Sequence, residues 1–285
     1  MDGSVLSGEL LGFPADARVL IVNADDFGMY QAINAAVVES IEDGIASSCS
    51  LMVPCPGASH AMRLLRQRPE MPFGVHLTLV CDLPSRRWGP MAGAARVPSL
   101  LDDRGEMFTP DERSALLDRA RVDEVEVEFR AQVDAVIDAG LMPMHLDWHC
   151  LADGGRDDIR ELTVALAGEY GLAVRIWLEP ARASMRGKGL PVTDNEFVDS
   201  FALDVDGKAA TYARLLRELP VGLSEWAVHP GLGDEESRAV DPGGWRVRRT
   251  DYEFLTSPEA REIVRQEEID VVDYRTVQRV WTAHA

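Results

Sequence analysis

The sequence is poor in cysteine and contains no pair of cysteines in a CxxC arrangement. Its four cysteines are most simply explained as free thiols in a reducing compartment. The N-terminal segment has neither the basic flank nor the long apolar core of a signal peptide, and no apolar run approaches the length that crosses a membrane. We therefore expect a cytoplasmic protein that does not associate with membranes.

Basic residues are also scarce. The chain has 29 Lys and Arg against 48 Asp and Glu, which gives a formal net charge of -19. A surface of this charge repels polyanions, so nucleic acids and anionic membranes are poor candidate partners. A neutral substrate, or one that leaves as a cation, fits this charge better.

Internal repeats, low-complexity linkers and breaks in composition are absent as well. A chain of 285 residues that is 46% hydrophobic can bury a substantial core. We expect an N-terminal tail over residues 1–17 and a single domain over residues 18–285.

Short segments rich in β-forming residues alternate with amphipathic helical segments. The predicted strands are 19–23, 48–53, 73–79, 144–148, 173–177, 224–229 and 269–273. The predicted helices are 32–42, 60–68, 111–139, 159–170, 211–219 and 258–267. Repeated strand-then-helix units predict an α/β fold in which helices surround a largely parallel sheet. Three long irregular stretches, 80–108, 179–208 and 231–250, are typical of functional loops.

Polar side chains gather where the apolar strands end. The first strand runs into Asp25 and Asp26, and later strands contain or precede other polar residues, namely His76, His145, Asp147, His149, Arg175 and His229. In a parallel sheet these residues converge on the carboxyl edge, where α/β barrels place their active sites. Taken alone, the two aspartates could be ordinary turn residues. Taken with the histidines, they predict a metal site.

The expected donor set indicates a catalytic metal site. Two imidazoles and one carboxylate leave positions open on a divalent ion, whereas a structural site is closed. In the segment from His145 to His149, alternate side chains share one face of the strand, so all three polar groups can reach one cavity. Nitrogen ligands favour Zn²⁺ or another transition metal over Mg²⁺, but the sequence does not decide which metal is bound.

Four motifs resemble those of the YdjC-like carbohydrate deacetylases, the group that includes the chitooligosaccharide deacetylases. They are NADDFG at 23–28, GVHLTL at 74–79, HLDWH at 145–149 and VHPG at 228–231. The resemblance covers residues 18–277. It implies a single-domain distorted (β/α) barrel related to polysaccharide deacetylases, with long loops at the C-terminal face. The implied reaction removes an acetyl group from an N-acetylated amino sugar, and the implied assembly is a homodimer.

The resemblance also implies roles for individual residues. Asp26, His76 and His149 would hold one divalent metal ion, Zn²⁺ or Mg²⁺. Asp25 would be the general base that activates a water molecule, and His229 would protonate the departing amine.

Three further residues are expected at the substrate. Arg175 would orient a carboxylate or the substrate, and His145 and Asp147 would contact substrate or orient the metal ligands through hydrogen bonds.

One motif departs from the family pattern. Family members continue the third motif with further histidines, whereas here Cys150 and Leu151 follow His149. The substrate preference of the site therefore stays open. Alternation along a strand turns Cys150 away from His149, which favours a buried thiol over a nucleophile. Trp88, in the first long loop, could stack on a sugar ring or pin the loop.

Two alternative functions fit the same residues. One is a metal-dependent hydrolase of another amide or ester, and the other is a carbohydrate-binding relative without catalytic activity.

Overall fold

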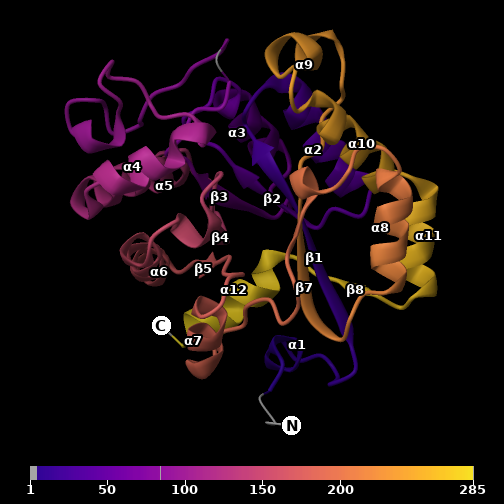
Figure 1. Ribbon diagram of the computed structural model, residues 1–285. Helices are drawn as coiled ribbons and strands as arrows, with labels where there is room; N and C mark the ends of the chain where they lie inside the picture. The colour runs from indigo at the N-terminus through magenta and orange to yellow at the C-terminus, as the bar shows by residue number, and fades with distance from the viewer. Residues whose placement is uncertain (1–4, 84, 285) are drawn as a thin grey trace.

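The computed structural model describes residues 5–83 and 85–284, in which one sheet of parallel strands forms the centre (Figure 1). The strand order is β5-β4-β3-β2-β1-β7-β6, and β8 pairs with the start of β1. The strands are β1 (Arg18–Phe27), β2 (Ser48–Leu51), β3 (Phe73–Leu77), β4 (His145–Trp148), β5 (Ala173–Val174), β6 (Val198–Asp199), β7 (Gly222–Val228) and β8 (Asp270–Val271). The sheet curls into a half-barrel, and its end strands β5 and β6 are not paired with each other among the residues described.

Helices cover the outside of the sheet. In Figure 1, α2, α8, α10 and α11 gather on one side of it and α4, α5 and α6 on the other. The helices are α1 (Ser7–Leu10), α2 (Gln31–Glu42), α3 (Ala58–Gln67), α4 (Arg113–Arg119), α5 (Val122–Asp138), α6 (Asp157–Tyr170), α7 (Ala181–Gly187), α8 (Lys208–Arg217), α9 (Glu235–Val240), α10 (Trp245–Leu255), α11 (Pro258–Gln266) and α12 (Tyr274–Ala283). No helix in the described part of the chain is long and apolar enough to span a membrane.

The predicted α/β class and the parallel sheet are confirmed, and each predicted strand overlaps one in the structure. The predicted helix over 111–139 was wrong in one respect, because Ala120 leaves helical geometry (ψ 125°) and separates α4 from α5. The stretches expected to be irregular contain short elements, among them β6, α7 and α10. The division into a tail at 1–17 and a domain at 18–285 stays a prediction; α1 lies inside that tail, whose first four residues lie outside the described part.

A bulge near the end of β1 explains how two neighbouring aspartates reach the same cavity. Ala24 pairs with Cys49 and Phe27 with Leu51, so β1 carries one more residue than β2 over this interval. Asp26 has φ 67°, in the left-handed region that non-glycine residues rarely adopt. In a regular strand Asp25 and Asp26 would point to opposite faces. The bulge lets both line the cavity.

Candidate active site

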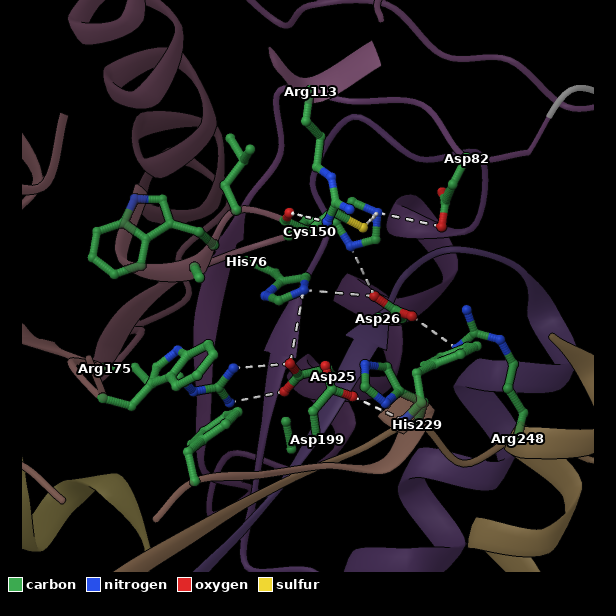
Figure 2. A pocket seen from close by; sticks show the side chains of 18 residues that line it. Asp25, Asp26, His76, Asp82, Arg113, Cys150, Arg175, Asp199, His229 and Arg248 are labelled. Carbon is green, nitrogen blue, oxygen red and sulfur yellow. Dashed lines mark hydrogen bonds and ion pairs between the residues drawn. The ribbon is translucent and has the colours of Figure 1, made fainter. Parts of the chain in front are cut away.

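A cavity of about 380 Å³ opens at the carboxyl ends of the strands (Figure 2). Six of the residues expected at the site line it: Asp25, Asp26, His76, His149, Arg175 and His229. They come from β1, β3 and the segments that follow β4, β5 and β7. The parallel topology therefore brings together residues that are up to 204 positions apart, counted from Asp25 to His229.

Asp26, His76 and His149 form a compact group of three potential metal ligands, whose ligand atoms all lie within 4.8 Å of one another. Asp26 Oδ1 is 3.1 Å from His149 Nδ1 and 3.5 Å from His76 Nε2. This oxygen is buried and has no hydrogen bond of acceptable geometry within the described residues. A buried carboxylate oxygen without a partner is costly. A divalent cation between these three atoms would satisfy it, so the residues fit a metal ion.

Carboxylates behind the two imidazoles orient them. His76 Nδ1 is 2.7 Å from Asp147 Oδ1, and His149 Nε2 is 3.4 Å from Asp82 Oδ2. If each carboxylate accepts an N–H, His76 Nε2 and His149 Nδ1 are left as free acceptors that face Asp26. The structure thus favours the tautomer of each imidazole that a metal requires.

Asp25 is held by a bidentate ion pair with Arg175, and both of its N···O distances are 2.8 Å. Asn23 Nδ2 donates a third hydrogen bond to Asp25 Oδ1 at 2.7 Å. Burial alone would raise the pKa of Asp25, but the Arg175 charge and hydrogen bonds prevail and lower it. Asp25 is therefore ionised at neutral pH.

Arg248 on α10 pairs with Asp26 from the other side, at 2.8 Å between Nη1 and Oδ2. Asp241 holds Arg248 in turn, at 2.8 Å from its Nε. Although burial opposes the charged form, the Arg248 guanidinium keeps the pKa of Asp26 well below its usual range. Asp26 is therefore anionic, as a metal ligand must be.

His229 follows β7 and lines the wall of the cavity. Its Nδ1 is 2.7 Å from Ser200 Oγ, and its backbone N–H donates to Asp251 Oδ2 at 2.8 Å. Phe201 packs edge-on against the ring, with 4.7 Å between ring centroids. These contacts hold the backbone of His229 in place and fix the orientation of its imidazole ring.

His145 and Asp147, expected to contact substrate, do not line the cavity. Both are fully buried beneath it, and His145 stacks on Tyr274 with 3.6 Å between ring centroids. Burial lowers the pKa of His145, so the ring is neutral. Substrate contact by these two residues is therefore not proposed; Asp147 instead holds His76.

The structure also shows the positions of Cys150 and Trp88, which both lie in loops. Cys150 does not turn away from His149: it has φ 58°, lines the cavity and places Sγ 3.4 Å from His149 Nε2. The expected alternation failed because Cys150 lies beyond the end of β4. Trp88 is buried and donates to the Val80 carbonyl oxygen at 3.1 Å, so it pins its loop and does not line the cavity.

Several cavity residues were missed by the sequence reasoning. They are Asp82, Arg113, Phe197, Phe201 and Arg248. All but Arg113 lie in the stretches expected to be irregular, whereas Arg113 begins α4 inside the predicted helix over 111–139. Trp177 and Phe197 stack with 4.5 Å between centroids and form an aromatic wall. The tryptophan and arginine content of the loops was the only sequence signal for these positions.

The fold and the cavity first define a structural class. The chain shares its fold with a variant of the peptidoglycan deacetylase PdaC from Bacillus subtilis, at TM-score 0.50 and 13% identity over 94% of this chain and 93% of that chain. The resemblance to a proposed cellobiose-phosphate cleavage protein from Enterococcus faecalis V583 is stronger, at TM-score 0.80 and 26% identity over 92% and 99% of the two chains. The parallel half-barrel is thus a fold that this chain shares with a peptidoglycan deacetylase.

Sequence comparison then gives the family. The model of the YdjC-like proteins matches residues 19–266, and the chain belongs to this family. One relative is a carbohydrate deacetylase from Brevibacillus brevis, 30% identical over 259 residues, which are 90% of this chain and 98% of the relative. Another is a chitooligosaccharide deacetylase from Serratia marcescens, 29% identical over 255 residues, which are 87% and 95% of the two chains.

Proposed function

We propose that the protein is a metal-dependent carbohydrate deacetylase that hydrolyses the N-acetyl group of an amino sugar or oligosaccharide. The observation that carries this proposal is the unpartnered Asp26 Oδ1, which faces His76 and His149 beside an ionised Asp25. Relatives named carbohydrate deacetylase and chitooligosaccharide deacetylase support the substrate class.

Asp26, His76 and His149 would hold the ion. A divalent metal bound there supplies a Lewis acid that polarises the acetyl carbonyl and increases the acidity of a water molecule. The nitrogen donors suit Zn²⁺ better than Mg²⁺.

Asp25 is the proposed general base. It is ionised, it lines the cavity next to the metal ligands, and Arg175 holds it by a bidentate ion pair. In hydrolysis the attacking water forms a bond to the acetyl carbon and gives a proton to Asp25. Arg175, which also lines the cavity, keeps the base in position.

His229 is the proposed acid. Breaking the C–N bond releases an amine, which needs a proton to leave. The Nδ1 of His229 is engaged with Ser200, so Nε2 is the nitrogen free to donate. The products are acetate and a free amino sugar, which is a cation at neutral pH and suits the acidic protein.

The aromatic wall made by Trp177 and Phe197 fits a sugar ring. Apolar sugar faces pack on aromatic side chains, and both residues line the cavity from loops that follow β5. The loop sequence after His149 differs from the family pattern, so the chain length and identity of the sugar are to be found by assay.

Acetate release from N-acetylglucosamine and its oligomers tests the proposal. We expect turnover that is lost with a chelator and restored by a divalent metal. Asp25→Asn should bind metal with unchanged affinity and lower kcat by about 10²- to 10⁴-fold, because the proton acceptor is lost. Absence of acetate from every acetylated amino sugar, alongside hydrolysis of another amide, would overturn the proposal.

A further inference from the structure

Below the cavity, two buried polar residues have no part in the proposed chemistry. Glu225 lies on β7 and Tyr274 begins α12; each is 2% exposed, and neither lines the cavity. Tyr274 Oη lies 3.0 Å and 2.8 Å from the two carboxylate oxygens of Glu225. Glu225 Oε1 also accepts a hydrogen bond from Arg175 Nε at 2.8 Å. The pair therefore contacts the residue that holds Asp25.

Three carboxylates engage the guanidinium of Arg175. Its two terminal nitrogens bind the carboxylate of Asp25, and Nη1 is also 3.0 Å from Asp147 Oδ2. Its Nε is engaged by Glu225 on the opposite edge. A planar guanidinium that is bonded at Nε cannot rotate without losing that bond. Glu225 thus determines which way the two terminal nitrogens face.

Arg175 follows a strand of only two residues, Ala173–Val174, and its backbone N–H donates to the Leu146 carbonyl oxygen at 3.0 Å, which anchors the Cα but leaves the long side chain free to turn. Side-chain contacts must do the positioning. Phe197 packs over the guanidinium, with 5.5 Å from Cζ to the ring centroid. Tyr274 is itself fixed, because its ring stacks on His145. The chain of contacts therefore runs from α12 through Glu225 and Arg175 to Asp25.

We propose that Glu225 and Tyr274 are positioning residues that hold the plane of Arg175 and thereby keep Asp25 oriented to accept the proton of the attacking water. This inference rests on the proposed function, in which Asp25 is the base. Glu225 and Tyr274 do not touch substrate, so their effect should appear in kcat and not in KM.

Kinetics of conservative variants test the inference. Tyr274→Phe keeps the ring and its stack on His145 and removes only the hydroxyl. Glu225→Gln keeps the shape of the side chain but removes the carboxylate charge, which weakens the hydrogen bond from Arg175 Nε. We expect each to lower kcat by about 10- to 100-fold, the usual range for residues that orient a functional group, with KM changed by less than about 2-fold.

A double-mutant cycle separates positioning from a structural effect. Because Glu225 acts through Arg175, Glu225→Gln should cost little further activity in an Arg175→Lys background. Glu128→Gln is the matched control: Glu128 is equally buried and accepts hydrogen bonds from the backbone of residues 91 and 92, but it does not line the cavity. Its kcat should equal that of the unaltered protein. Equal costs of Glu225→Gln in both backgrounds would overturn the inference.

Crystal structures of the metal-loaded variants give a readout that does not depend on turnover. In Tyr274→Phe and Glu225→Gln we expect the Arg175 guanidinium to rotate away from Asp25. If the unaltered protein released no acetate, the proposed function would fail, but the inference would still be decided by these structures. An Arg175 that stays paired with Asp25 in both variants would refute it.

Discussion

At the scale of single residues, Asp82, which lies in the loop after β3, contacts the proposed metal ligand His149. Asp82 Oδ2 lies 3.4 Å from His149 Nε2, while the other ring nitrogen faces Asp26 at 3.1 Å. Burial opposes a charge on His149, but nearby Cys150, Asp82 and Asp26 raise its pKa well above the usual value. A proton and a metal ion therefore compete for this imidazole. We expect metal affinity to rise with pH.

Asp82→Asn should weaken metal binding by about 10- to 100-fold, because a neutral amide orients the imidazole less strongly and makes it a poorer donor. Isothermal titration calorimetry with Zn²⁺ and a competing chelator measures the change in metal affinity. Asp103→Asn is the control, since the Asp103 side chain is 95% exposed and pairs only with Arg119 among the described residues. Equal affinities for the Asp82 and Asp103 variants would show that Asp82 does not orient His149.

The residues that the sequence could locate share one property: they follow or interrupt a buried strand. Asp25, Asp26, His76, His149 and His229 belong to short motifs in which strand geometry places each side chain within a few residues. Arg248 could not be located in this way. It pairs with Asp26 from a helix more than 220 positions later, and that helix lies in a stretch without clear periodicity.

At the scale of elements, β3 and β4 depend on a glycine for their close packing. A Cβ on Gly74 would lie within 2.6 Å of three ring atoms of His145. His145 cannot move aside, because Tyr274 stacks on its other face. The glycine in the GVHLTL motif thus makes room for a buried imidazole. The pattern of hydrophobic residues in the sequence does not reveal this requirement for glycine.

Gly74→Ala should lower the free energy of unfolding by about 1–3 kcal/mol, the usual cost of overpacking. Denaturant unfolding followed by circular dichroism checks it. Gly168→Ala is the matched substitution: Gly168 lies inside α6 with open space around the added methyl, so this change should stabilise the protein by about 0.5–1 kcal/mol. The two substitutions should therefore change the free energy of unfolding in opposite directions. An unchanged free energy of unfolding for Gly74→Ala would show that His145 can shift without loss of stability.

Seven of the eight strands in the described residues could be predicted from the sequence, whereas β6 and the lengths of the strands could not. β5 has only two residues, although the apolar run around it continues to Trp177. The chain leaves the sheet there because Trp177 and Leu178 donate their backbone N–H groups to the Asp153 side chain. Such contacts between distant segments decide where an element ends, and local periodicity contains no information about them.

At the scale of the whole molecule, the acidic character seen in the composition continues into the interior. Asp25, Asp147 and Glu225 surround the single guanidinium of Arg175. Because one positive charge cannot balance three negative charges, at least one of the carboxyl groups should have a raised pKa. Burial, opposed by the Arg175 charge, raises the pKa of Glu225 to about 7. Burial opposes ionisation of the other two as well, but the charges of Arg175 and His76 together keep the pKa values of Asp25 and Asp147 low.

A raised pKa links the stability of the protein to pH. The folded state binds a proton at Glu225 more tightly than the unfolded chain does, so this contribution to stability is complete below about pH 4.5 and is lost as the pH rises through about 7. A shift of this size corresponds to roughly 3 kcal/mol at most.

Glu225→Gln removes the group whose protonation changes over this pH range. Relative to this variant, the unaltered protein should therefore lose stability between pH 5 and pH 8, by several degrees in Tm. Scanning calorimetry of both proteins measures the difference, with Glu262→Gln as an exposed control that should follow the unaltered protein. A Tm difference that stays constant across this range would show that the pKa of Glu225 in the folded protein does not lie near 7.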